Sequence, residues 1–180
     1  KTARTGDATV IALEGGRFVL VAPVAQAPAI WDRLAGSLTR VGAPCWEWLE
    51  IANGLPWITA GTQDQFVPQM ANLELVGGVN FRKGCYPGQE IVARTQYLGK
   101  PKRRLFLAHV DAEVSPAPGA SLVADGDQPA GTVVNAAPAP DGGVDLLAVV
   151  QTASAEAATV RLGSSTGPAL RFRPLPYPVP

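Results

Sequence analysis

From Leu105 onward the chain alternates short β-type runs with turns rich in Gly, Pro and Asp, and this pattern most constrains its fold. The runs span 105–110, 121–123, 131–135, 144–150, 158–162 and 169–172. Strands this short, separated by turn residues such as Asp141-Gly142-Gly143, are typical of a small antiparallel barrel. The 19 Gly and 17 Pro of the whole chain agree with a turn-rich body. We therefore expect a C-terminal β-barrel over residues 99–180.

The first forty-three residues show a different pattern, in which two β-type runs are followed by a helical one. Two β-type runs, 8–13 and 17–22, flank Glu14-Gly15-Gly16, which is a hairpin signal. Residues 26–41 carry apolar side chains at helical spacing, with Gly42 just beyond them. Residues 2–7 resemble the end of a polar loop. This β-β-α order predicts the second half of a ferredoxin-like α+β domain over residues 1–43.

Residues 44–98 form the third predicted part, which completes the α+β portion. A helix is expected over 44–52, because Asn53-Gly54 is a typical left-handed helix stop. A second, short helix is expected over 89–97. Residues 98–104 look like a linker, because they hold Gly and Pro together with four cations. The tail after residue 173 is rich in Pro and is expected to be extended.

Composition and charge exclude several functions. Fifteen basic residues balance fifteen acidic ones, so the chain is not a general binder of nucleic acid or of membrane surfaces. Cys45 and Cys85 are too few for a disulfide framework, and with His109 alone they predict no metal site. No apolar run reaches membrane-spanning length. We expect a soluble protein of a reducing, cytoplasmic compartment.

The run Lys83-Gly84-Cys85-Tyr86-Pro87-Gly88-Gln89-Glu90 is the strongest candidate for chemistry. It places a thiol beside a lysine, in a glycine-flanked loop just before a helix start. A nearby cation and the free N–H groups of a helix N-terminus both favour a thiolate. Pro87 suits the first helical position. Cys85 is therefore the candidate functional thiol; the alternative is a small buried hydrophobic residue.

This run resembles the K-G-C-Y-x-G-Q-E motif of the YgfZ family, folate-binding proteins linked to iron–sulfur clusters and related to the glycine cleavage T-protein. Seven positions of the motif match, and Arg94 matches in its extension. Leu49–Pro56, Phe66–Asn72 and Gly131-Thr132-Val133 are similar to further family segments in the same order. The resemblance implies ferredoxin-like domains followed by a β-barrel. It also implies that the N-terminal part of the family fold is missing here.

The resemblance implies a folate-binding accessory protein that supports iron–sulfur cluster assembly or repair and, through it, tRNA modification. The implied cofactor is tetrahydrofolate or a one-carbon derivative. The implied partners are iron–sulfur proteins or their assembly machinery, without a membrane and without direct nucleic-acid binding. Besides Cys85, the residues proposed to contact folate or another ligand are Lys83, Tyr86, Glu90, Arg94 and Arg103.

Each candidate also has a plainer interpretation. Glu90 and Arg94 are spaced to form an ion pair on one helix face. The cations Lys100, Lys102, Arg103 and Arg104 could hold a folate tail or simply be a solvated linker. Cys45 is expected in the core, and His109 is expected to be structural. Trp46, Trp48 and Trp57 could stack on a ring, but core packing is favoured for each.

Two departures separate the chain from the T-protein pattern. Cys85 stands where the T-protein has an acid, and Ala52 stands where its pterin-binding glutamate lies. Both count against aminomethyl transfer, so a folate-dependent aminomethyltransferase or methyltransferase is the second hypothesis. A non-catalytic protein- or RNA-interaction module is the third. Whether the protein is an enzyme is left open by the sequence, with the accessory role favoured.

Overall fold

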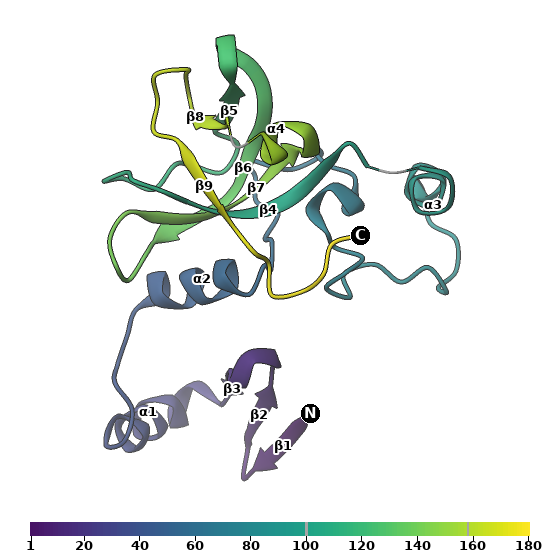
Figure 1. The fold of residues 1–180 in the computed structure, drawn as a ribbon. Helices are drawn as coiled ribbons and strands as arrows, with labels where there is room; N and C mark the ends of the chain where they lie inside the picture. The colour runs from purple at the N-terminus through teal and green to yellow at the C-terminus, as the bar shows by residue number, and fades with distance from the viewer. Residues whose placement is uncertain (100, 158) are drawn as a thin grey trace. The chain divides into compact units, whose positions relative to one another are not determined.

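The computed structural model describes residues 1–99, 101–157 and 159–180 (Figure 1). It forms two compact units, Lys1–Gly42 and Ala43–Pro180, and each is described by itself. The division into parts 1–43, 44–98 and 99–180 stays a prediction. The mixed α+β class with antiparallel sheets is confirmed.

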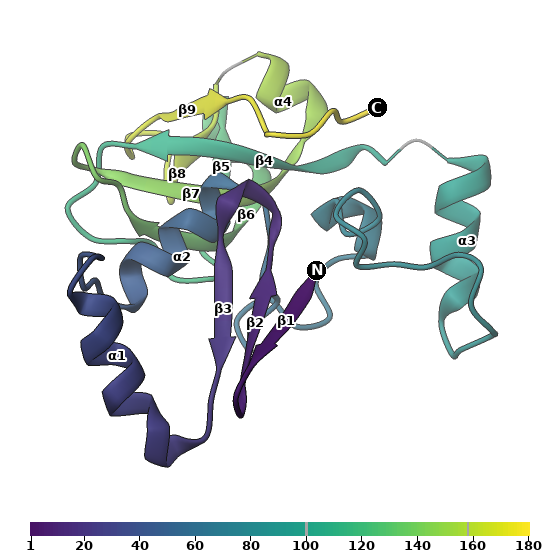
Figure 2. The ribbon, with the colours of Figure 1, turned by 90° about the horizontal axis from the view of Figure 1, so that it is seen from below.

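The first unit contains a three-stranded antiparallel meander, visible in Figure 2. Its strands are β1 (Thr2–Thr5), β2 (Ala8–Ala12) and β3 (Phe18–Val21). The short 3-10 turn η1 (Glu14–Gly16) joins β2 to β3, and Gly15 and Gly16 both have positive φ there, as the hairpin signal predicts. The expectation of a polar loop over 2–7 is wrong. Strand β1 is exposed along its length, so its sequence carries no apolar alternation, yet its backbone pairs with β2.

The helix of the first unit is shorter than its apolar spacing predicts. After the 3-10 turn η2 (Val24–Gln26), α1 spans Ala27–Ala35, with Pro28 near its start. We expected it to continue to residue 41. It ends at Ala35, because Gly36 has poor helix propensity and no buried core residue holds the following turn in place.

The second unit is built on a six-stranded antiparallel sheet in the order β8-β5-β6-β7-β4-β9. The strands are β4 (Arg103–Val110), β5 (Ser121–Ala124), β6 (Gln128–Pro138), β7 (Val144–Gln151), β8 (Arg161–Leu162) and β9 (Leu170–Arg173). The two edges meet, because Arg161 forms a bridge with Ala169 and Leu170 N–H donates to Val160 O at 2.9 Å. The expected C-terminal barrel is thus confirmed as a strongly curled sheet (Figure 1).

Strands β4 and β7 have apolar side chains on both faces because both faces are buried. One set, including Ala108, Leu146 and Ala148, packs inside the curled sheet with residues of the other strands. The alternate set, including Leu105 and Leu147, packs outside it with residues from the segment before β4. This explains why these strands appear as continuous apolar runs in the sequence.

The outer core is covered by α2 (Ala43–Ala52), which packs across β6 and β7 (Figure 1). The helix ends as predicted: Gly54 has φ 66°, and Leu55 N–H reaches back to Glu50 O at 3.0 Å. The C-terminal tail returns to this point, where Leu175 joins the outer core and the Tyr177 hydroxyl donates to Gly54 O at 2.7 Å.

Of the remaining elements, helix α3 (Gln89–Leu98) was predicted, whereas the two 3-10 turns η3 (Pro68–Ala71) and η4 (Asp125–Asp127) and helix α4 (Thr152–Glu156) were not. The turn η3 and helix α3 precede the barrel, and η4 lies between β5 and β6. Helix α4 follows β7 directly. The expected linker over 98–104 is also partly wrong, because Arg103 and Arg104 belong to β4. Lys100, and Ala158 of the expected fifth run, lie outside the described residues.

Candidate functional site

The cysteine loop leads directly into α3. The helix begins at Gln89, and Gly88 before it adopts the left-handed conformation with φ 82°. The side chain of Gln89 turns back, so its Oε1 accepts the backbone N–H of Tyr86 at 3.2 Å. Pro87 therefore lies in the turn before the helix and not at its first position, which corrects the prediction. The turn fixes the path of the loop that carries Cys85.

Cys85 is a free, exposed thiol, so the alternative of a buried packing residue is wrong. The ammonium of its neighbour Lys83 lies 4.5 Å from the centre of the Tyr86 ring, a cation–π contact that holds both side chains in the loop. Cys45 is also exposed, although we expected it in the core, because it lies near the start of α2 ahead of the residues that face the barrel.

Three of the ligand residues proposed from the sequence border hollows on two opposite sides of α3. Lys83 and Tyr86 border a hollow of about 60 Å³ together with Gln89, Val92, Ala93 and Tyr97. Arg94 borders a different hollow of about 440 Å³ with Ile91 and Thr95. At about 100° per residue these two sets project from opposite sides of a helix. The structure therefore does not bring all of the predicted ligand residues into one hollow.

The other predicted residues are exposed. Glu90 and Arg94 form no ion pair with each other in the described structure, despite their i,i+4 spacing. Arg103 lies on β4 with its side chain in solvent, whereas the adjacent Arg104 is buried. Strand alternation places these two neighbours on opposite faces of the sheet.

Arg104 is the feature that the sequence analysis most clearly missed. Its Nη1 donates to the backbone oxygen of Gln69 at 2.9 Å and forms an ion pair with Glu74. The Arg104 and Glu74 side chains keep only 10% and 7% of their surface exposed. Gln69 is itself buried, and its Nε2 donates to Val92 O at 2.7 Å in α3. Arg104 thus ties the start of the barrel to η3, and Gln69 ties η3 to α3.

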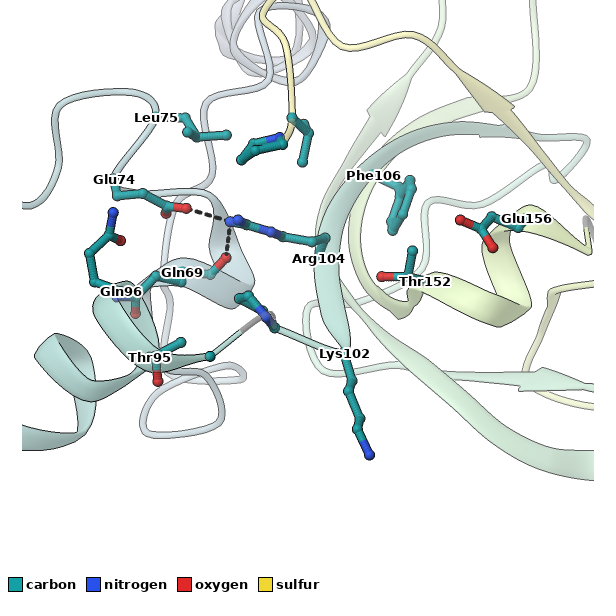
Figure 3. A pocket seen from close by; sticks show the side chains of 14 residues that line it. Gln69, Glu74, Leu75, Thr95, Gln96, Lys102, Arg104, Phe106, Thr152 and Glu156 are labelled. Atoms are coloured by element: carbon teal, nitrogen blue, oxygen red, sulfur yellow. Dashed lines mark hydrogen bonds and ion pairs between the residues drawn. The ribbon is translucent and has the colours of Figure 1, made fainter.

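A cavity of about 740 Å³ lies beside this ion pair, shown in Figure 3. We call it the Arg104 cavity. Its wall comes from η3 and the segment after it, α3, the start of β4, α4 and the C-terminus: Gln69, Glu74, Leu75, Thr95, Gln96, Gly99, Pro101, Lys102, Arg104, Phe106, Thr152, Glu156, Val179 and Pro180. Figure 3 shows Arg104 directed toward Glu74, and Lys102 directed away from them.

A buried polar network joins α2 to the barrel. The carboxylate of Asp145 lies 2.7 Å from His109 Nδ1, and it accepts hydrogen bonds from Trp48 Nε1 at 2.9 Å and from Arg173 at 3.1 Å. These contacts make His109 a structural residue, as expected. Trp48 packs in the outer core with its N–H satisfied, so it is not available to stack on a ligand.

Trp57 differs from Trp48 because 60% of its surface is exposed. It borders a hollow of about 440 Å³ with Glu47, Thr59 and Asn135. Asn135 fixes this segment, since its side chain exchanges two hydrogen bonds with the backbone of Trp57, at 2.8 and 2.9 Å. Trp57 is therefore the better placed of the predicted tryptophans for contact with a flat ring.

The pKa values of Tyr177, Asp111 and Arg171 are clearly shifted, and the last two are shifted by their mutual ion pair. Burial raises the pKa of the Tyr177 hydroxyl; a hydrogen bond with Asn72 lowers it in part, and the Glu74 carboxylate raises it further. At the surface, a bidentate pair with Arg171 at 2.5 and 2.8 Å lowers the pKa of Asp111. The shift of Tyr177 reports the partial burial of its side chain near Glu74.

The curled barrel with α2 across its outer face belongs to a class of fold that is also found in a glycine cleavage enzyme. The structure matches the aminomethyltransferase T of the glycine cleavage system from Bartonella henselae with a TM-score of 0.70. The match covers 96% of this chain and 50% of that one at 20% identity, which establishes similarity of fold alone.

Sequence comparison identifies the family. The chain is 35% identical over 177 residues to the tRNA-modifying protein YgfZ of Yersinia pestis (strain Pestoides F), covering 96% of this chain and 54% of that protein. It is 37% identical over 166 residues to the protein of the same name from Klebsiella pneumoniae (strain 342), covering 91% and 50%. No family model matches the chain. Over the part that it spans, the chain belongs to the YgfZ family.

Two further findings concern the length that the chain shares with its relatives and the absence of membrane-spanning helices among the described residues. The chain spans about half the length of these curated relatives. Among the described residues, no helix is both long and apolar enough to cross a membrane.

Proposed function

We propose that this chain is part of a folate-dependent accessory protein that supports iron–sulfur cluster assembly or repair and, through it, tRNA modification. The observation that carries the proposal is the free, exposed Cys85, held in a loop by the Lys83–Tyr86 contact and the turn into α3. The YgfZ relatives, named as tRNA-modifying proteins, support the link to tRNA. In this proposal Cys85 is the functional thiol, and the protein acts in the cytoplasm.

The cavities constrain how a folate could bind. The hollow beside Lys83 and Tyr86, of about 60 Å³, is far smaller than the roughly 300 Å³ at which ligand pockets begin. These two residues therefore do not enclose a folate ring. We place them, with Glu90, at the edge of a bound tetrahydrofolate or one-carbon derivative. Arg94 and Arg103 are cations suited to its anionic glutamate tail.

The experiment that tests this function is complementation with the full-length protein in cells that lack it. Cys85→Ala should abolish the restored tRNA modification while the protein still accumulates and folds, because the thiol is exposed and supports no core contact. Cys45→Ala is the matched control, as it removes the other exposed thiol. Full activity of Cys85→Ala would refute the role of the thiol.

The second candidate is a folate-dependent aminomethyltransferase or methyltransferase, which the fold similarity to aminomethyltransferase T favours. Ala52 and Cys85, which replace the acids of the T-protein pattern, count against it. Turnover of an aminomethyl donor with tetrahydrofolate by the full-length protein would support it. A non-catalytic interaction module is the third candidate, and steeply salt-dependent RNA binding would be its sign.

A further inference from the structure

Helix α3, which follows the cysteine loop, is weakly anchored to the rest of its unit. It has ten residues, a length at which an isolated helix is marginal in water. Among its described side chains Val92 alone is buried, whereas Ile91 and Tyr97 keep 62% and 72% of their surface exposed. The position of α3, and of the loop that enters it, therefore depends on few contacts.

Within the described part of the chain, one hydrogen bond joins α3 to a segment outside its own loop. In that bond, Gln69 Nε2 of η3 donates to Val92 O at 2.7 Å. The turn η3 is itself held to β4 twice, because Arg104 Nη1 donates to Gln69 O at 2.9 Å and Asn72 Nδ2 donates to Leu105 O at 3.1 Å. Figure 3 marks the contact between Arg104 and Gln69 with a dashed line. Gln69 therefore links the first strand of the barrel to α3.

The side chain of Gln69 adds little to stability. Gln69 is 1% exposed, and its Oε1 is buried without a partner among the described residues. An unsatisfied buried acceptor costs at least as much free energy as one ordinary hydrogen bond contributes. Val92 O lies inside α3, where a helical carbonyl already accepts the N–H four residues on, so it would stay bonded without Gln69. An apolar side chain of similar length would therefore leave stability unchanged or raise it.

We propose that Gln69 is a positioning residue, which fixes α3 against η3 and thereby holds the cysteine loop in the place where Cys85 acts. Val92 lies one helical turn after Gln89, and Gln89 Oε1 accepts the backbone N–H of Tyr86 in that loop at 3.2 Å. The bond from Gln69 thus reaches the end of α3 that sets the path of the loop. The inference rests on the proposed function, because only a functional thiol requires a fixed place.

The hydrogen bond itself is tested on the unaltered chain by NMR. The side-chain amide protons of Gln69 should exchange with solvent at least tenfold more slowly than those of Gln65, because Gln69 is buried and Gln65 is exposed. Gln65 is a close reference, since its Nε2 also donates to a backbone oxygen at 2.7 Å, that of Gly61 in its own loop. Equal exchange rates for the two side chains would overturn the proposal, since Gln69 could not then hold α3.

The positioning role is tested in the full-length protein with Gln69→Met, and Gln65→Met is the matched control. Gln69→Met removes the side-chain amide but keeps the backbone oxygen to which Arg104 donates. Iodoacetamide labelling of Cys85 is measured with and without tetrahydrofolate, together with backbone amide exchange of α3. In Gln69→Met alone, we expect protection of Cys85 to fall at least fivefold and exchange of α3 to rise about fivefold, the effect of one lost hydrogen bond. The thermal midpoint should not fall.

A lowered thermal midpoint of Gln69→Met would make Gln69 a residue that serves stability and would overturn the proposal. Unchanged protection of Cys85 in the folded variant, or unchanged exchange of α3, would overturn it as well. If tetrahydrofolate does not protect Cys85 even in the unaltered protein, the proposed function fails, while the exchange rates still decide whether Gln69 places α3. The two failures are therefore distinguishable.

Discussion

Arg103 and Arg104 are neighbours in the sequence but have opposite environments in the structure. Arg103 is exposed, whereas Arg104 is buried against Glu74 and the backbone of Gln69. Both were expected in one basic linker, either holding a folate tail or in solvent, and Arg103 was proposed as a ligand residue. The sequence could not reveal the ion pair, since Glu74 lies thirty residues away.

At the residue scale, we expect Arg104→Met to destabilise the protein by about 3–5 kcal/mol, because Glu74 would remain buried and uncompensated. Urea unfolding followed by circular dichroism measures this loss. Arg103→Met is the matched control and should change stability by no more than about 0.5 kcal/mol, since its side chain is in solvent. Equal losses for the two variants would contradict the buried pair.

Tyr177 gives a prediction on pH. Its pKa is raised mainly by burial, so the folded state holds the phenolic proton more tightly than the unfolded state. Its contribution to stability is therefore present below the ordinary pKa of about 10 and is lost as pH rises through the raised value. Stability of the unaltered chain should fall with alkaline pH more than that of Tyr177→Phe. Tyr97→Phe, which changes an exposed tyrosine, should behave like the unaltered chain.

At the scale of elements, the sequence predicts best where local signals and tertiary packing agree. Helix α2 ends at Asn53-Gly54 as predicted, and the predicted runs match strands β4 to β7 and β9, with ends shifted by a few residues. Strand β1 and helix α4 were missed because neither has an apolar pattern of its own. Strand β1 depends on backbone pairing with β2, and α4 is too short to show a helical period.

At the end of α2, Gly54 is required for two reasons: its backbone has positive φ, and its position is packed against Tyr177. Gly54 has φ 66°, and a Cβ there would lie 2.7 Å from the Tyr177 ring. Gly126 has a similar φ of 69° with nothing within 4 Å of that position. We expect Gly126→Ala to cost about 1–2 kcal/mol for the backbone alone, and Gly54→Ala to cost clearly more. Thermal unfolding of both variants checks this, and equal shifts would contradict the close contact with Tyr177.

At the scale of the whole molecule, the core is unevenly distributed. Both hydrophobic clusters lie entirely within Ala43–Pro180, and Ala8 is the buried apolar residue among the described positions of Lys1–Gly42. We therefore expect a fragment of residues 43–180 to fold and unfold cooperatively on its own. Circular dichroism and one-dimensional proton NMR would test this. A fragment without a cooperative transition would contradict the division into two units.

The site was only partly predictable at this scale. The motif predicted the helix that follows Cys85, since loop glycines and the helix start are local signals, whereas the role of Cys85 itself stays a prediction. The sequence could not show that Lys83 and Tyr86 border a hollow on one side of α3 and Arg94 a hollow on the other, because the path of the loop before the helix depends on packing. The Arg104 cavity draws on six separate segments, so no local pattern marks it.

The central claim is that Cys85 is a functional thiol close to bound folate, and alkylation tests it most directly. The rate of iodoacetamide labelling would be measured on the full-length protein for Cys45→Ser and Cys85→Ser, each with and without tetrahydrofolate. Because both thiols are exposed, each variant serves as the control for the other. The account predicts faster labelling of Cys85 than of Cys45, with protection of Cys85 alone by tetrahydrofolate. Equal labelling rates, unaffected by tetrahydrofolate, would contradict it.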